Sequence, residues 1–201
     1  MIQVMILARR ARPRKTVEDF MNLPDGSRAE LIDGDLFMCP APREPHQWAV
    51  GNLYVLLTQF AHSRKLGKVY VAPFDVHLPS GDVVEPDILY VAKANLGIVQ
   101  DWVRGAPDLV IEVLSPEGID RDRIVKRDLY AQNGIREYWI VDAEAKAVEV
   151  FTLRDGTRQA GPARYEPNGY FESNDILVSS LLPELKLPVA DVFADPLSNA
   201  E

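Results

Sequence analysis

The sequence predicts a mixed α/β domain in which helices flank a central mixed sheet. Short apolar stretches typical of strands alternate with two longer segments whose apolar residues recur at helical spacing. One stretch, 106–114, is apolar on both faces, as expected for a strand in the middle of a sheet. The 201 residues suit one domain over 16–195, and 1–15 is expected to be a flexible basic extension.

The first half of the chain is expected to form two helices, a hairpin and a pair of strands. A threonine suited to the N-cap precedes a short helix, and Asp33-Gly34 favours the turn of a hairpin. Apolar residues at helical spacing then indicate a helix with one buried side. The expected elements are a helix over 16–20, a hairpin over 29–38, a helix over 46–64, and strands over 68–78 and 83–91.

The second half is expected to add the central strand, a helix and a strand hairpin. Gly134 suits the position that follows a helix. The run Tyr138–Val141 fits a base-stacking surface or core packing, and its place after a helix favours the core. The expected ranges are a partly helical connection over 92–104, a strand over 106–114, a helix over 120–133, a strand over 137–142 and its partner from residue 147.

The composition excludes several classes of protein. No apolar run approaches the roughly 20 residues that a membrane-spanning helix needs. The N-terminus places its apolar stretch before its basic one, the reverse of a secretory signal, so we expect a cytoplasmic protein. The single cysteine, Cys39, rules out an internal disulfide, and with three histidines it argues against a structural zinc site.

The net charge of −8 argues against a simple nucleic-acid coat, which is usually basic. An enzyme that acts on nucleic acid needs only a local basic rim, because a metal ion neutralises its acidic site. Candidate rims are 9–15, 64–68 and 121–127, although solvated surface is the favoured explanation for any one of them.

Glu112 lies in the middle of the apolar stretch 106–114, where burying an unpaired carboxylate would cost several kcal/mol. It therefore needs a metal ion, a cationic side chain or a proton as its partner. A structural salt bridge is the alternative to a functional site.

Asp87 supplies a second acid, because it follows Pro86 at the start of an apolar stretch. If the two stretches pair, the carboxylates lie close together, since neighbouring strands are only about 4.8 Å apart. Such an oxygen-rich site suits Mg²⁺ or Mn²⁺ better than zinc. Asp108 shares a strand face with Glu112, but four residues of strand span about 13 Å, too far for one ion. We expect Asp108 to bond nearby backbone instead.

The helix after residue 115 carries Asp122, Lys126 and Tyr130 on one stripe, because they are spaced by four. If the stripe faces the sheet, Lys126 reaches the carboxylates, where it could orient or deprotonate water or stabilise charge on a phosphate. The alternative is an exposed Asp122–Lys126 pair of little energetic weight.

These residues resemble the PD-(D/E)XK nuclease superfamily, which has the restriction-endonuclease-like fold. Pro86-Asp87 followed by Glu112-x-Leu114 carries the resemblance. Within it, the chain is similar to the Uma-type restriction endonucleases of bacteria over about 16–195. The matching segments, more specific together than singly, are 29–36 (AELIDGDL), His46-Gln47, 85–88 (EPDI), 107–116 (PDLVIEVLSP), Asp122-x3-Lys126-x3-Tyr130 and 134–142 (GIREYWIVD).

The resemblance implies that Asp87 and Glu112 hold a divalent metal ion. The superfamily's lysine would fall at position 114, where this chain has leucine, so the resemblance implies that Lys126 replaces it. It also implies that Glu30 lies near the acids and completes the metal shell, and that His46 contacts phosphate or water. A plain helix-start residue is the alternative for His46.

Three functions follow as hypotheses. The first is an Mg²⁺- or Mn²⁺-dependent endonuclease that cuts phosphodiesters, with DNA as its expected partner. The second is a catalytically degenerate nuclease-like domain that binds nucleic acid or a protein. The third is a hydrolase of a smaller phosphate ester. The apolar tail, 176–193, is expected to cover an edge of the domain or to meet a second subunit in a homodimer.

Overall fold

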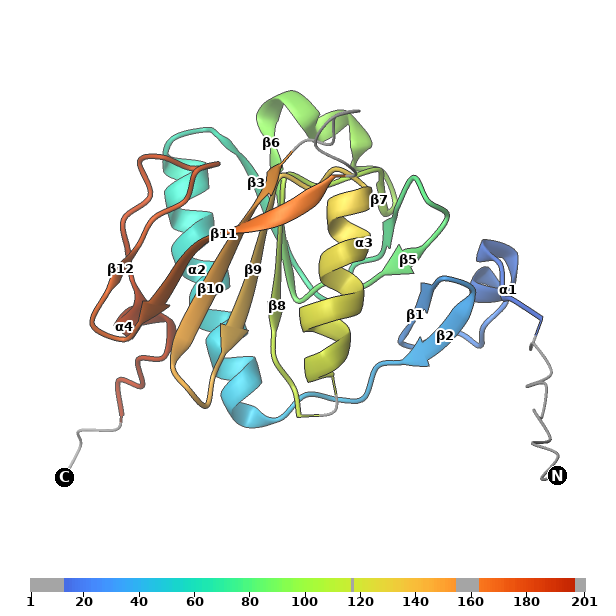
Figure 1. Ribbon diagram of the computed structural model, residues 1–201, viewed down its shortest axis with the longest axis horizontal. Helices are drawn as coiled ribbons and strands as arrows, with labels where there is room; N and C mark the ends of the chain where they lie inside the picture. Colours follow the sequence, from blue (N-terminus) through green and yellow to red (C-terminus); the bar gives the residue numbers. More distant parts are fainter. Residues whose placement is uncertain (1–12, 117, 155–162, 198–201) are drawn as a thin grey trace, which may run out of the picture.

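A six-stranded mixed sheet forms the centre of the molecule (Figure 1). The computed structural model describes residues 13–116, 118–154 and 163–197. Within that sheet, β8 and β9 pair in parallel and the other neighbours are antiparallel, as the mixed arrangement predicted requires. In spatial order the strands are β11 (Arg164–Glu172), β10 (Ala147–Arg154), β9 (Glu137–Asp142), β8 (Leu109–Val113), β6 (Ile88–Ala92) and β3 (Gly67–Val71).

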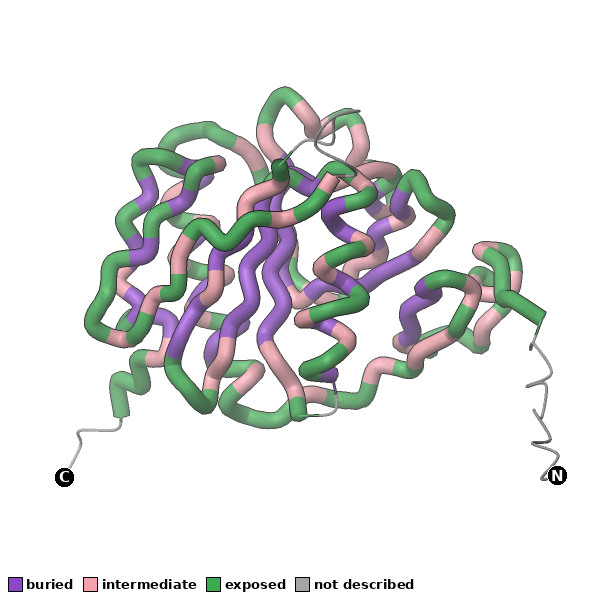
Figure 2. Tube along the Cα trace, in the orientation of Figure 1, coloured by how far each residue is buried: buried purple, intermediate pink, exposed green. Residues whose placement is uncertain are grey.

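The middle strands are buried on both faces, as Figure 2 shows. Every residue of β8 is buried, which confirms the central strand expected from its apolar pattern. Alternation along β8 sends Ile111 and Val113 into the core on one face and Val110 into the core on the other. Glu112 lies on the same face as Val110. Its carboxylate therefore points into a layer from which the packed side chains exclude water.

Two helices cover the two faces of the sheet (Figure 1). The long helix α2 (Glu44–Ser63) buries Val50, Leu53 and Leu57 against the face that carries Ile111. The opposite face is covered by η2 (Arg121–Lys126), a π-helical segment that continues into α3 (Arg127–Gln132). These elements confirm the helices expected over 46–64 and 120–133, with the π-helical turns as an addition.

A second sheet carries the predicted hairpin. Its strand order is β2 (Asp35–Met38), β1 (Ala29–Ile32), β5 (Val83–Val84), β4 (Val76–His77) and β7 (Val103–Arg104). The hairpin turns at Asp33 and Gly34, which adopt φ of 48° and 77° as a tight turn of this type requires. The short helix α1 (Val17–Met21), capped by Thr16, packs beside β1.

The strands expected over 68–78 and 83–91 are each interrupted, which corrects the sequence-based boundaries. β3 and β4 are separate strands in different sheets, and so are β5 and β6. Pro73 and Pro86 lie at these two breaks, and neither can donate a hydrogen bond to a strand ladder. The second break leaves Asp87 just before β6, where its backbone carbonyl still accepts a hydrogen bond from the Ala72 amide at 3.0 Å.

The C-terminal tail packs on its own domain. Its elements are β12 (Ile176–Leu177), β13 (Leu187–Pro188) and α4 (Val189–Val192), and Leu177, Val189 and Val192 join the core beneath α2. The buried carboxylate of Glu137 holds this tail, because it accepts hydrogen bonds from Ser179 Oγ (2.6 Å) and the Leu181 amide (3.0 Å). The tail therefore covers the domain, the first of the two roles expected for it.

Three further expectations concern the remaining segments. The connection 92–104 contains a 3₁₀ helix, η1 (Lys93–Ile98), which confirms its helical character. Tyr138–Val141 is buried, so it is core and not a stacking surface. Of the extension, 1–12 lies outside the described residues, while the Arg14 guanidinium pairs with Asp33 at 2.9 Å. Among the described helices, none combines the length and the apolar character needed to cross a membrane.

Candidate functional site

Asp87 lies opposite Glu112 on the neighbouring strand, as the sequence predicted. The antiparallel register pairs Ile88 with Ile111, so the next step places Asp87 beside Glu112. One Asp87 oxygen, Oδ2, accepts a hydrogen bond from the Val113 amide at 2.8 Å. This backbone contact fixes the carboxylate at the edge of the sheet.

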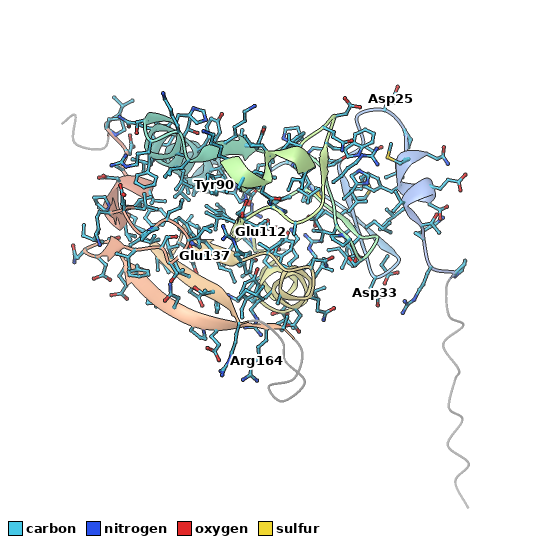
Figure 3. All side chains as sticks on the ribbon, turned by 90° about the horizontal axis from the view of Figure 1, so that it is seen from above. Asp25, Asp33, Tyr90, Glu112, Glu137 and Arg164 are labelled. Atoms are coloured by element: carbon cyan, nitrogen blue, oxygen red, sulfur yellow. The ribbon has the colours of Figure 1, made fainter. Side chains whose placement is uncertain are left out.

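Glu112 is the buried centre of the site. Figure 3, which views the molecule from above, shows it in the interior, far from Asp33 at the rim. Its Oε1 accepts hydrogen bonds from Lys126 Nζ (2.9 Å) and from Tyr130 Oη (2.6 Å), which descend from η2 and α3. The partner required by the apolar surroundings of Glu112 is therefore a cationic side chain supported by a hydroxyl.

Lys126 lies among three carboxylates and not in solvent. It is 4% exposed, and its Nζ lies 2.9 Å from Glu112 Oε1, 2.9 Å from Glu30 Oε1 and 3.5 Å from Asp122 Oδ1. The alternative of an exposed Asp122–Lys126 pair is thus wrong, because the stripe faces the sheet. Lys126 therefore supplies the site with an ammonium group, which Leu114, at the position expected for the superfamily's lysine, does not supply.

Glu30 reaches the site from the second sheet. It is 1% exposed on β1, and its Oε1 accepts a hydrogen bond from the Glu85 amide at 3.1 Å. Its Oε2 is buried without a hydrogen-bond partner, and the Nε of Arg121 is 4.0 Å away. The predicted hairpin therefore contributes an acid to the site. Lys126 contacts both this acid and Glu112, and so it links the second sheet to the central sheet.

His46 contacts Asp87 directly. It lies in the first turn of α2, and its Nε2 is 3.1 Å from Asp87 Oδ2. The other ring nitrogen, Nδ1, is buried without a hydrogen-bond partner. The structure thus brings together all five residues singled out from the sequence: Glu30, His46, Asp87, Glu112 and Lys126.

Burial and mutual repulsion raise the pKa of two carboxyl groups in this site, Glu112 and Asp122. Burial raises the pKa of Glu112 well above its usual value, and Lys126 opposes that rise only in part because Asp122 and Asp87 add to it. Burial also raises the pKa of Asp122. Burial lowers the pKa of Lys126, but Glu112 and Glu30 outweigh this and hold it well above its ordinary value. The acids outnumber the nearby ammonium, so the site favours an additional cation.

These residues line a pocket of about 270 Å³. Its wall includes the loop 40–43, the first turn of α2, the residues after β8 and the polar faces of β1 and η2. Sequence reasoning noted Asp122 and Tyr130 only for their spacing, and it missed Arg28 and Glu85, which form an ion pair in the wall. No local pattern marks that pair, since 57 positions separate the two residues.

The other sequence candidates lie outside this pocket. Asp108 accepts a hydrogen bond from the Ala92 amide (2.7 Å) and pairs with Arg136 (2.9 Å), which confirms its expected structural role. Gln47 is exposed, and His77 stacks on Trp102. Of the basic segments, 64–68 lies at the far end of α2, and most of 9–15 lies outside the described residues.

A sequence model of one protein family, described as "Uma2: Putative restriction endonuclease", matches residues 17–190. The chain belongs to the Uma2 family. Its fold is similar to that of a protein described as a "putative nuclease belonging to DUF820" from Anabaena variabilis ATCC 29413. The two share 19% sequence identity with a TM-score of 0.72, over 89% of this chain and 97% of the other. No protein with a curated description matches.

The match assigns this Uma2 chain to a nuclease family and to a restriction-endonuclease-like fold. Both were expected from the order and spacing of the sequence motifs. The pocket around Glu112 lies within the matched residues, so the family assignment covers every residue that lines it.

Proposed function

We propose that this Uma2 protein is a divalent-metal-dependent endonuclease that hydrolyses phosphodiester bonds in DNA. The observation that carries the proposal is the convergence of Asp87, Glu112 and Lys126 in one pocket, from two paired strands and the helix above them. Membership of a family described as restriction endonucleases supports the reaction class.

The donor set fits Mg²⁺ or Mn²⁺. Asp87 and Glu112 offer hard carboxylate oxygens at one pocket, and buried oxygens of Glu30 and Asp122 lack hydrogen-bond partners. Within the described ranges, no three Asp, Glu, His or Cys side chains form a closed cage for an ion. Mg²⁺ needs no such cage, because it commonly binds through one or two carboxylates and keeps several waters.

The site residues would have separate roles in the reaction. Asp87 and Glu112 would hold the ion, which supplies Lewis acidity toward the phosphate and lowers the pKa of bound water. Lys126 holds Glu112 in position through its 2.9 Å contact and offers positive charge beside the phosphate. Tyr130 donates to the same Glu112 oxygen and fixes its orientation. His46 contacts Asp87 Oδ2, the oxygen that also accepts the Val113 amide, and so it helps to orient that carboxylate.

The test is cleavage of DNA by the whole chain. Supercoiled plasmid, linear duplex, single-stranded DNA and RNA are incubated with Mg²⁺, with Mn²⁺ or with EDTA. We expect metal-dependent cutting of DNA that falls at least about a hundredfold in Asp87→Asn and Glu112→Gln. Matched controls are Asp128→Asn and Glu184→Gln, which change the same atoms at side chains that are 66% and 78% exposed.

Each outcome has a clear meaning. Equal cutting by the wild type and both site variants would refute the site assignment. Cutting in EDTA would refute metal dependence. A wild-type protein that cuts nothing but binds nucleic acid without metal would replace the proposal with the degenerate binding domain. Hydrolysis of bis-p-nitrophenyl phosphate without DNA cleavage would favour a small-ester hydrolase.

A further inference from the structure

The cations that line the pocket differ in how firmly carboxylates hold them. Arg28 is paired with Glu85 through both its Nε and Nη2. Lys126 lies among three acids, two of them at 2.9 Å. Arg121 is held more loosely, because its Nε lies 4.0 Å from Glu30 Oε2, beyond hydrogen-bond distance. That Nε is buried and has no hydrogen-bond partner.

The position of Arg121 is nevertheless defined. It is the first residue of η2, one position before the buried Asp122, and it lines the pocket together with Asp87 and Glu112. Its guanidinium carbon lies 5.3 Å from the centre of the Phe37 ring. A ring contact of this kind restrains a guanidinium without using its N–H donors. Arg121 therefore presents an oriented cation with unused donors to an acid-rich pocket.

The loop after β8 leaves room for this guanidinium. A Cβ built at Gly118 would lie 3.5 Å from Arg121 Nη2 and 3.2 Å from Asp122 Oδ2. The polar end of Arg121 thus lies beside this loop, at the same end of β8 as Glu112. A Cβ at 118 would press on Asp122 and on Ser115 Oγ, 3.1 Å away, and would be in ordinary contact with Arg121, so glycine suits this position.

We propose that Arg121 binds a non-bridging oxygen of the phosphodiester that is cut. This inference rests on the proposed nuclease function and assigns a substrate-binding residue within it. A phosphodiester is an anion, and the carboxylates of Glu30, Asp87, Glu112 and Asp122 repel it unless a cation faces it that is not hydrogen-bonded to any of them. A guanidinium suits this task, because its planar fork matches phosphate oxygens and it stays charged. The phosphate would also supply the acceptor that the buried Nε lacks.

Arg127 provides a matched control on the same helix. Its Nε lies 3.9 Å from Asp128 Oδ1, and its guanidinium carbon lies 5.9 Å from the Phe151 ring. These distances are similar to those of Arg121, but Asp128 is exposed where Glu30 is buried, and Arg127 does not line the pocket. Arg127→Gln therefore reproduces the loss of charge, of a weak ion pair and of a ring contact, without loss of a pocket cation.

The experiment compares kcat/KM for a DNA oligonucleotide among wild type, Arg121→Gln, Arg121→Lys and Arg127→Gln, with Mn²⁺ binding measured for each. Loss of a donor to the developing charge should lower kcat/KM for Arg121→Gln about 10²- to 10³-fold. Arg121→Lys should lose less, because it keeps the charge without the fork. Arg127→Gln should stay within about twofold, and Mn²⁺ affinity should be unchanged in all variants.

A modified substrate separates contact with phosphate from a structural role. A methylphosphonate at the mapped cleavage position removes the oxygen charge that Arg121 would bind. The wild type should slow markedly on this substrate. Arg121→Gln should slow by a smaller factor, because its contact with that oxygen is already gone and only the contributions of the metal ion and Lys126 remain to be lost. A structural role would instead make the two losses multiply.

The outcomes distinguish this inference from the function on which it rests. The role of Arg121 alone is overturned if the wild type cuts DNA and kcat/KM of Arg121→Gln lies within about twofold of the wild-type value. It is also overturned if the losses from the variant and from the methylphosphonate multiply. A wild type that cuts no DNA overturns both. A large loss in Arg121→Gln that is accompanied by weaker Mn²⁺ binding also refutes the inference, because the defect would then lie in the acids.

Discussion

Replacing Lys126 by methionine should destabilise the fold by an amount that grows with pH. The change keeps an unbranched side chain as far as Cε but removes the ammonium that lies 2.9 Å from both Glu112 and Glu30 and 3.5 Å from Asp122. Leaving a buried charge uncompensated costs roughly 3–5 kcal/mol. We expect a loss of this size in the free energy of unfolding at pH 8.

The pH dependence follows from the direction of the carboxyl pKa shifts. The pKa of Glu112 in the folded state is raised above its unfolded value, chiefly by burial, so the folded state binds more protons. The stability that this carboxyl contributes is full at low pH and is lost as pH rises through the raised pKa. Without Lys126 the pKa rises further. The variant should therefore lose less stability at pH 5 than at pH 8, because a protonated Glu112 needs no cation beside it.

Urea unfolding followed by tryptophan fluorescence measures this effect. For a slope of about 2 kcal/mol per molar urea, the expected loss shifts the midpoint by about 1.5–2.5 M at pH 8. Lys186→Met, a change at an exposed lysine, is the matched control and should leave the midpoint nearly unchanged. A loss below about 1 kcal/mol at pH 8, or equal losses at the two pH values, would refute the buried-cation argument.

Three other predictions test separate parts of the structure. Burial and the nearby Glu30 raise the pKa of the Cys39 thiol to about 12. At pH 8 a thiol reagent should therefore label folded protein at least about a hundredfold more slowly than unfolded protein. Equal labelling rates would contradict this. Glu137→Ala should cost about 3 kcal/mol in urea unfolding, because Trp139, Ser179 and the Leu181 amide lose their buried acceptor, and a loss under 1 kcal/mol would contradict that role. Tyr130→Phe should lower stability by about 1 kcal/mol, through loss of the 2.6 Å hydrogen bond to Glu112, and should leave the fold intact by circular dichroism.

Much of the fold was predictable because its signals are local. The helix expected over 46–64 is α2, Glu44–Ser63, since apolar spacing and the proline at its start are visible in the sequence. The strand expected over 106–114 became β8, because residues apolar on both faces can only lie inside the sheet. The errors fell at Pro73 and Pro86, where two strands were predicted to continue through breaks. A proline ended the hydrogen-bond ladder at each of these breaks. Which sheet the strands before and after the break joined depended on partner strands distant in sequence.

By itself, the sequence determined that Glu112 needs a partner and that Asp122, Lys126 and Tyr130 share one helical stripe, because strand alternation and helical spacing are set within a few residues. Only the tertiary structure decided that this stripe faces the sheet and that Lys126 is buried. It also decided that Glu30 joins from another sheet and that Arg28 pairs with Glu85. The physical reason is that spacing fixes which residues share a face, whereas the direction of that face depends on how the whole core packs.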